Sequence, residues 1–199
     1  VSTLELDTAL ARDGAVVVTH DSELNPDITR DASGQWLKAI GPTMLSLTYA
    51  EIARYDVGRI RPDTPYALRF KDQTPVDGER IPRLKDVFAL ARQRANALVR
   101  FNIETKISPL ESGQTTTPED FARKLIVAVR SAGMAERTTI QSFDWRTLRA
   151  AKRLAPEIGT VCLTSETEGF DTVQRASSSP SPWAAGSHSC GCPSTSSRT

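Results

Sequence analysis

Three short stretches of the chain place acidic, imidazole or amine side chains at the ends of apolar, β-branched runs. They are Glu5-Leu6-Asp7, His20-Asp21 and Asn102-Ile103-Glu104-Thr105-Lys106. Carboxylates are ligands that hard divalent cations prefer, and a histidine and a lysine beside them suit an anionic substrate. The residue types therefore predict a site for a divalent cation and an anion.

The strand period of two gives most of these side chains a common face. In Leu4–Asp7 it sends both leucines to one face and both carboxylates to the other. In Leu98–Lys106 it places Val99, Phe101 and Ile103 together on an apolar face. The opposite face of this second strand carries Arg100, Asn102, Glu104 and Lys106.

Strand-like and helix-like segments alternate along most of the chain. The expected strands are Thr3–Asp7, Ala15–His20, Leu98–Lys106, Thr138–Phe143 and Gly159–Thr164. The first two expected helices are 49–55, which starts at the capping box of Thr48, and a helix with the apolar stripe Leu84, Val87, Phe88 and Ala91. The other two are Glu119–Ser131, which follows Thr117 and Pro118, and Trp145–Leu154, which follows the N-cap Asp144. Repeated alternation of helix and strand predicts a parallel α/β fold.

Two segments depart from that alternation. On local grounds Asp13-Gly14 predicts a hairpin turn, because the link around it is too short for a parallel crossover. Residues Arg54–Arg80 form a long polar insertion, rich in Pro, Asp and Arg, of a length that is usually functional or mobile. We expect it to lack an apolar lip for lipid, which favours a water-soluble substrate.

Composition excludes several classes of protein. The 199 residues carry a formal net charge of +1 with no long basic run, so we expect no nucleic-acid partner. No apolar stretch is long enough for a transmembrane segment. The three cysteines are an odd number and predict no disulfide framework. Nothing in the sequence predicts the oligomeric state.

The composition changes near residue 176. From there to Thr199 Ser and Pro are frequent and Asp and Glu are absent, so we expect 176–199 to be a disordered tail. His188, Cys190 and Cys192 lie in this tail without a fourth ligand and do not predict a metal site. The chain begins with Val1 close to its first strand, so we expect a fragment or a processed chain.

The ordered set of motifs resembles the glycerophosphodiester phosphodiesterase family over residues 1–175. The similar segments are Leu4-Glu5-Leu6-Asp7, Asp13-Gly14, Val17-Val18-Thr19-His20-Asp21, Arg80-Ile81-Pro82-Arg83-Leu84-Lys85-Asp86-Val87-Phe88, Glu104-Thr105-Lys106 and Ile140-Gln141-Ser142-Phe143-Asp144. The resemblance implies a (β/α)8 TIM barrel with its site at the C-terminal strand ends. It also implies that Asp13-Gly14 joins neighbouring barrel strands without a helix, and we follow this in place of the hairpin.

The resemblance also implies a role for each site residue. Glu5, Asp7 and Glu104 would hold one Mg²⁺ or Ca²⁺ ion, and Lys106 would contact the substrate phosphate. His20 would be one half of a general acid/base pair. The expected substrate is a small glycerophosphodiester, hydrolysed to an alcohol and sn-glycerol 3-phosphate in phospholipid catabolism. Resemblance to members with signal peptides favours a periplasmic or secreted location.

The resemblance is incomplete at both ends. The family's first-strand His-Arg-Gly motif would lie upstream of Val1, and only five of eight barrel strands are recognisable, so we expect an incomplete barrel. Two alternatives to the soluble hydrolase therefore stay open. One is a phospholipase-D-like lipid phosphodiesterase, and the other is an inactive fragment that only binds metal or phosphate.

Overall fold

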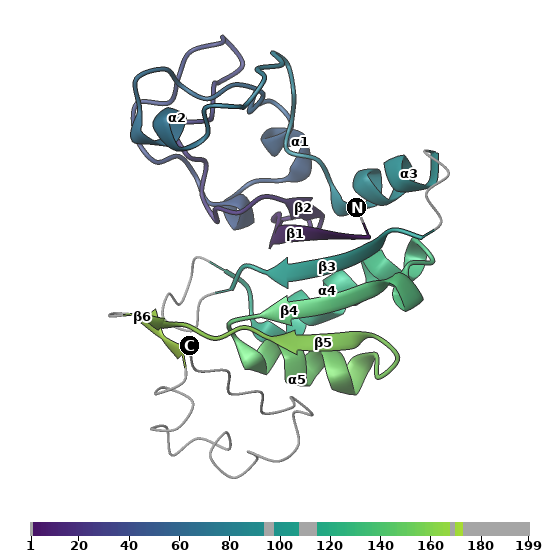
Figure 1. Ribbon diagram of the computed structural model, residues 1–199. Helices are drawn as coiled ribbons and strands as arrows, with labels where there is room; N and C mark the ends of the chain where they lie inside the picture. The colour runs from purple at the N-terminus through teal and green to yellow at the C-terminus, as the bar shows by residue number, and fades with distance from the viewer. Residues whose placement is uncertain (1, 94–97, 108–114, 168–169, 173–199) are drawn as a thin grey trace.

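The structure, a computed structural model, describes residues 2–93, 98–107, 115–167 and 170–172, and its centre is one five-stranded sheet (Figure 1). The strand order is β2-β1-β3-β4-β5, and β1, β3, β4 and β5 are parallel. The bounds are β1 Thr3–Leu10, β2 Val16–Val18, β3 Arg100–Thr105, β4 Thr138–Ser142 and β5 Gly159–Cys162. All five expected strands are thus confirmed, and among the described residues they form one α/β sheet.

The three longer helices pack on the apolar face of this sheet and at its edge, and two short helices lie in the segment between β2 and the first of them (Figure 1). Their bounds are α1 Tyr49–Ile52, α2 Pro65–Arg69, α3 Leu84–Gln93, α4 Pro118–Ser131 and α5 Trp145–Leu154, with short 3₁₀ turns η1 Met44–Ser46 and η2 Ala135–Arg137. The capping box at Thr48 and the N-caps Thr117 and Asp144 are confirmed. Helix α1 ends at Ile52, before the expected end near residue 55.

The largest core lies between the sheet and helices α3–α5. The stripe of α3 buries Leu84 and Phe88, and the Phe88 ring meets Phe101 of β3 edge-on at 4.9 Å between centroids. Ile103 and Ile140 extend this core along the apolar face. Burial of a side chain such as Phe88 contributes about 1.5–3 kcal/mol. The apolar face therefore anchors β3, and the polar residues between its buried positions are held on the other side.

The segment around Asp13-Gly14 is a hairpin. Strands β1 and β2 are antiparallel, with Leu10 opposite Val16, and Gly14 turns with a φ of +84° that suits glycine. The strands are neighbours without a helix, as the resemblance implies. The expectation that replaced the hairpin is nevertheless wrong, because β1 continues to Leu10 and the chain then turns back to pair β2 with β1.

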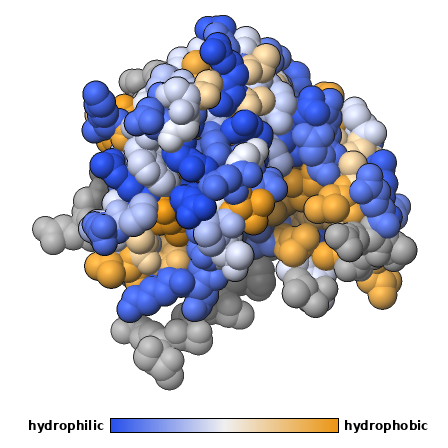
Figure 2. Space-filling view, turned by 90° about the horizontal axis from the view of Figure 1, so that it is seen from above, coloured by the Kyte–Doolittle hydropathy of each residue, from blue (hydrophilic) through white to orange (hydrophobic). Residues whose placement is uncertain are grey.

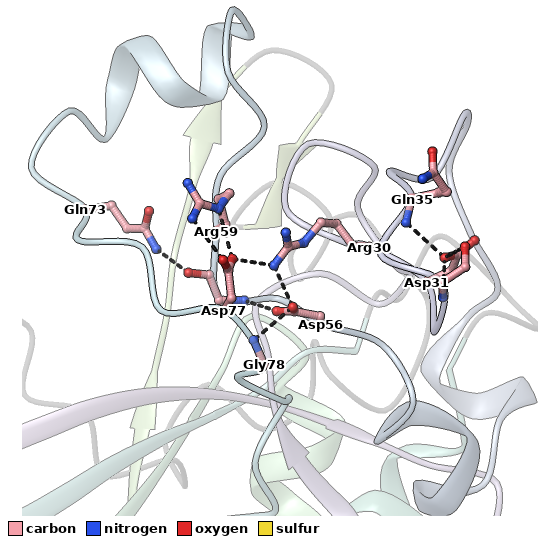
Figure 3. A network of polar contacts seen from close by, with 10 residues as sticks. Arg30, Asp31, Gln35, Asp56, Arg59, Gln73, Asp77 and Gly78 are labelled. Atoms are coloured by element: carbon pink, nitrogen blue, oxygen red, sulfur yellow. Dashed lines mark hydrogen bonds and ion pairs between the residues drawn. The ribbon is translucent and has the colours of Figure 1, made fainter.

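The insertion Arg54–Arg80 is ordered by a network of ion pairs rather than by a large core (Figure 3). Arg30 Nη2 donates to Asp56 Oδ2 at 2.6 Å and to Asp77 Oδ1 at 2.5 Å. Arg59 donates two hydrogen bonds, of 2.9 and 3.0 Å, to the same Asp77 carboxylate. Hydrogen bonds from both arginines lower the pKa of Asp77 to about 2.

Asp56 is the more buried acid of this network. Its carboxylate accepts the backbone N–H groups of Gly58 and Gly78, both at 2.9 Å, as well as the guanidinium of Arg30. Burial would raise the pKa of Asp56, but these hydrogen bonds outweigh burial and lower it. The network thus joins three segments that are far apart in the sequence, and each of its carboxylates is neutralised in place.

The surface of the insertion is mixed in character. Seen from above, the molecule is largely hydrophilic, with a group of hydrophobic residues toward the side on which α3 lies (Figure 2). Helix α2 nevertheless exposes Leu68 to 69%, and the following Phe70 to 43%. The expectation that the insertion lacks an apolar lip is therefore wrong. Leu68 lies in the short helix α2 and Phe70 caps its end, and the polar composition of the segment does not predict this helix.

A smaller hairpin follows the sheet, with strands β6 Glu166–Thr167 and β7 Phe170–Asp171. The expected disordered tail 176–199, with His188, Cys190 and Cys192, lies outside the described residues. Among the residues that are described, none of the helices is long and apolar enough to cross a membrane.

Candidate active site

Three carboxylates gather on the polar face of the sheet. In the parallel register Asp7 of β1 lies beside Glu104 of β3, and Glu5 lies beside Asn102. One carboxylate oxygen of each of Glu5, Asp7 and Glu104 falls within 4.8 Å of the other two. The sequence prediction that these side chains share a face is confirmed, and the structure brings them together.

Lys106 lies at the end of β3 and bridges two of these acids. Its Nζ atom is 2.9 Å from Glu104 Oε1 and 3.2 Å from Asp7 Oδ1. Burial opposes the charged form of this amine, yet the hydrogen bond and charge of Glu104 prevail and raise the pKa of Lys106. Lys106 is therefore a fixed positive charge at the cluster.

One ammonium group does not neutralise three carboxylates. Burial raises the pKa of Glu104, whose side chain is only 8% exposed, and the nearby Asp7 charge adds to the effect. Glu5 has a raised pKa for the same two reasons, in the same order. Both shifts oppose the ionised form, so a bound cation would stabilise these carboxylates.

A chain of side-chain hydrogen bonds orients Glu5 from the neighbouring strands. Thr139 donates to Asn102 at 2.9 Å, Asn102 donates to Gln141 at 2.6 Å, and Gln141 donates to Glu5 Oε1 at 2.7 Å. The sequence reasoning assigned no site role to Gln141, although Thr139 and Gln141 alternate onto the same polar face of β4. That alternation is the signal that could have identified it.

His20 is at the edge of the cluster because β2 folds back along β1. The N–H of Thr19 donates to the carbonyl of Asp7 at 3.0 Å, which carries the next residue, His20, along the acidic end of β1. When its ring is protonated, His20 lies close enough to Glu5 to lower the pKa of that carboxyl against the effect of burial. The ring is well exposed, with 71% of the side chain accessible.

Asp21 fixes the orientation of the His20 ring. His20 Nδ1 lies 2.8 Å from Asp21 Oδ1, and Asn25 donates to the other oxygen of Asp21 at 2.9 Å. An ionised carboxylate only accepts, so Nδ1 is the donor and the lone pair is on Nε2. Nε2 has no hydrogen-bond partner among the described residues and is available for proton transfer.

The donor set fits a hard divalent cation. Ca²⁺ and Mg²⁺ bind oxygen ligands at about 2.0–2.6 Å, so two oxygens on opposite sides of one ion are separated by about 4–5 Å. The 4.8 Å limit among Glu5, Asp7 and Glu104 lies within this range. The excess of carboxylate charge in a partly buried place supplies the attraction. These oxygens suit either ion.

Comparison with known proteins assigns the family. The model of the glycerophosphoryl diester phosphodiesterase family matches residues 1–190. The chain belongs to this family. A curated glycerophosphodiester phosphodiesterase of Caldanaerobacter subterraneus subsp. tengcongensis is 32% identical over 155 residues, which are 78% of this chain and 51% of that protein. The uncharacterized protein YqiK of Bacillus subtilis is 28% identical over 82% of this chain and 55% of its own length.

Solved structures of the family show the same fold, a TIM barrel. A Silicibacter pomeroyi protein that carries the family name is 33% identical, with a TM-score of 0.77 over 86% of this chain and 57% of its own. An Oleispira antarctica phosphodiesterase, solved with the product sn-glycerol-3-phosphate, is 20% identical, with a TM-score of 0.59 over 85% of this chain and 57% of its own. The chain spans about half the length of the curated relatives that it matches.

Proposed function

We propose that the chain carries the metal-binding and phosphate-binding part of a divalent-cation-dependent glycerophosphodiester phosphodiesterase. Its reaction would be hydrolysis of a glycerophosphodiester to an alcohol and sn-glycerol 3-phosphate, a step of phospholipid breakdown. The observation that carries this proposal is the convergence of Glu5, Asp7 and Glu104 within 4.8 Å, with Lys106 beside them. Family membership and the product named for the Oleispira relative support the same substrate class.

Each residue has a separate task in the proposed reaction. Glu5, Asp7 and Glu104 would hold Mg²⁺ or Ca²⁺, and the bound ion would supply charge neutralisation and polarisation at the phosphate. Lys106 would contribute a second positive charge to the phosphate oxygens. Its contacts with two of the acids also keep its amine at the cluster.

His20 would move the proton. With Nδ1 bonded to Asp21, its Nε2 can take a proton from the attacking water or give one to the departing alcohol. Asp21 would hold the ring in the tautomer that this step requires. We assign the second acid or base of the pair to none of the described residues.

A coupled assay of glycerol 3-phosphate release from glycerophosphocholine tests the proposal on the purified full-length protein. We expect EDTA to abolish release and added Mg²⁺ or Ca²⁺ to restore it. His20→Ala should lower kcat by about 10²–10⁴-fold without loss of metal binding, because general acid/base catalysis is worth that much. His188→Ala is the matched control and should keep its rate. Release that persists in EDTA, or a full rate in Glu104→Ala, contradicts the assignment.

One observation favours a second candidate, a phospholipase-D-like lipid phosphodiesterase. Leu68 and Phe70 are exposed on the insertion, and Arg69 and Lys71 alternate with them. Such a segment can contact a lipid surface. Hydrolysis of a lysophospholipid in vesicles at a higher kcat/KM than glycerophosphocholine would establish the lipid function instead.

A further inference from the structure

The polar face of the sheet carries two neighbouring rows of side chains, each running across β1, β3 and β4. The first row is Glu5, Asn102 and Thr139. The second row, next along the same face, is Asp7, Glu104 and Gln141. Gln141 thus completes the row of two proposed metal ligands, and its hydrogen bond reaches back to the third ligand, Glu5, in the other row.

The charge of Glu5 sets the direction of every hydrogen bond in the chain behind it. An ionised carboxylate only accepts, so Gln141 presents its Nε2 group to Glu5 Oε1, 2.7 Å away. The Oε1 atom of Gln141 then faces Asn102, whose Nδ2 group donates to it at 2.6 Å. Asn102 Oδ1 in turn accepts the hydroxyl of Thr139 at 2.9 Å. A flip of either amide would place two acceptors against each other, so the chain holds one arrangement.

Gln141 is the rigid member of this chain, and Glu5 is the member that gains from it. Gln141 is only 6% exposed, and both ends of its amide are bonded. Glu5 is the most exposed of the three clustered acids. An exposed glutamate loses rotamer freedom when it is ordered, and a hydrogen bond from a buried amide restricts that freedom before an ion arrives.

The three acids are therefore held from two sides. Lys106 engages Asp7 Oδ1 and Glu104 Oε1 from the end of β3. Gln141 engages Glu5 Oε1 from β4. The described residues place no amine, amide or hydroxyl group on the second oxygen of any of these acids, so each acid keeps one oxygen for an ion.

Single contacts in fixed positions do not suit the two candidate ions equally. Mg²⁺ demands a nearly ideal octahedron at about 2.0–2.1 Å and keeps several waters. Ca²⁺ takes about six to eight oxygens at about 2.3–2.6 Å in a flexible geometry and accepts carboxylates with one or both oxygens. A displaced Glu5 carboxylate would thus cost Mg²⁺ more than Ca²⁺.

We propose that Gln141 is a positioning residue of the metal site, which holds Glu5 in place and so raises the affinity for Mg²⁺ more than the affinity for Ca²⁺. Asn102 and Thr139 act through Gln141, by fixing the direction of its amide. The inference rests on the proposed function, because it concerns the ion that the same three acids would hold.

Gln141→Met tests the proposal, because methionine keeps the length of the buried side chain and removes its hydrogen bonds. Isothermal titration of the purified protein with Mg²⁺ and with Ca²⁺ measures both affinities. We expect the Mg²⁺ affinity to fall at least about tenfold, since hydrogen-bond partners of metal ligands are typically worth about 10–100-fold. The Ca²⁺ affinity should fall by less than about threefold, because Ca²⁺ tolerates displaced ligands.

The ratio of the two affinities separates positioning from a general loss of structure. Partial unfolding lowers the number of sites for both ions and leaves this ratio unchanged. Gln93→Met makes the same replacement at the exposed end of α3 and is the matched control, with both affinities kept. An unchanged Mg²⁺ affinity in Gln141→Met, or an equal loss for both ions, overturns the proposal.

Thr139→Val extends the test to the far end of the chain. Valine keeps the shape of threonine and removes the hydroxyl that Asn102 accepts, so the Mg²⁺ affinity should fall about two- to fivefold. In the double variant with Gln141→Met this substitution should add no further loss, because the hydroxyl acts only through Gln141. Additive losses would overturn the role of the chain.

Hydrolysis of glycerophosphocholine separates this inference from the proposed function. Unchanged ion affinities in Gln141→Met, in a protein whose wild type hydrolyses the diester with metal, would refute the positioning role alone. A selective loss of Mg²⁺ affinity in Gln141→Met, in a protein whose metal-bound wild type releases no glycerol 3-phosphate, would refute the proposed function alone. A wild type that binds neither ion would overturn both.

Discussion

The carboxylates of the strand cluster and those of the insertion differ in the direction of their pKa shifts. Glu5 and Glu104 in the cluster have raised pKa values, whereas Asp56 and Asp77 in the insertion have lowered ones. Arg30 and Arg59 give Asp56 and Asp77 an arginine each, whereas the cluster supplies one lysine for three acids. The acids of the insertion are thus neutralised by arginines of the protein, while a cation from solution would stabilise the acids of the cluster.

The largest expected effect on stability follows from removing Arg30. This side chain is 16% exposed and its partner Asp56 is 13% exposed, so Arg30→Leu leaves a nearly buried carboxylate without its cation. We expect a loss of about 2–3 kcal/mol in the free energy of unfolding, below the about 3–5 kcal/mol of a fully buried pair. Urea unfolding measures it.

Added metal ions distinguish this loss of stability from a loss of stability in the cluster. Added Ca²⁺ or Mg²⁺ should not restore the stability of the Arg30→Leu protein, because the broken pair joins Arg30 to the insertion and is not part of the cluster. Arg59→Leu is the control, since its partner Asp77 is well exposed and keeps Arg30. A full rescue by metal would refute the separation of the two regions.

A smaller effect of opposite sign is expected at the cluster. Glu104→Gln removes a charge that burial disfavours, so it should raise the Tm of the metal-free protein. The same variant should lose the rise in Tm that Ca²⁺ or Mg²⁺ gives the wild type. Thermal unfolding with EDTA and with metal measures both changes, and a lower Tm in EDTA would contradict the account.

The sequence predicts the cluster better than the insertion, for a physical reason. Glu5, Asp7 and Glu104 follow from strand period and parallel pairing, which are local and regular. The contacts of Arg30 with Asp56 and Asp77 join residues 26 and 47 positions apart, and no periodic pattern indicates them. The hairpin at Gly14 teaches the same lesson, because its local turn signal was correct.

The role of Gln141 shows what local reasoning leaves out. Its alternation on β4 places it on the polar face, but its bond to Glu5 spans 136 positions and two intervening strand pairings. The cavity lined by His20, Val57 and Tyr66 likewise brings together residues that are far apart in the sequence. Residue types predicted the chemistry of the site, and long-range packing determines its walls.

The smallest expected effect is the opposite response of the two regions to pH. The pKa of Asp77 falls from an ordinary 3.8 to about 2, so its stabilising contribution is complete above pH 3.8 and is lost as the pH falls through 2. The pKa of Glu104 is raised above its ordinary 4.5. Its contribution to the stability of the folded protein is therefore complete below pH 4.5 and is lost as the pH rises through the raised pKa.

The fluorescence of Trp36 can report the loss of the Asp77 contribution at low pH. The Arg30 guanidinium lies 5.6 Å from the centre of the Trp36 ring, so loosening of the insertion should change its fluorescence. We expect a transition between pH 4 and 2 in the wild type that Asp77→Asn alters. A transition that is unchanged in this variant would exclude the Asp77 network as its source.

The central claim is that the strand cluster, and not the insertion, binds a divalent cation. Isothermal titration of the purified protein with Ca²⁺ and with Mg²⁺ tests it most directly, in the wild type, Glu104→Gln and Asp77→Asn. The account predicts one ion per chain, an affinity lowered at least about tenfold in Glu104→Gln, and no change in Asp77→Asn. Unchanged binding in Glu104→Gln, or no binding in the wild type, would contradict it.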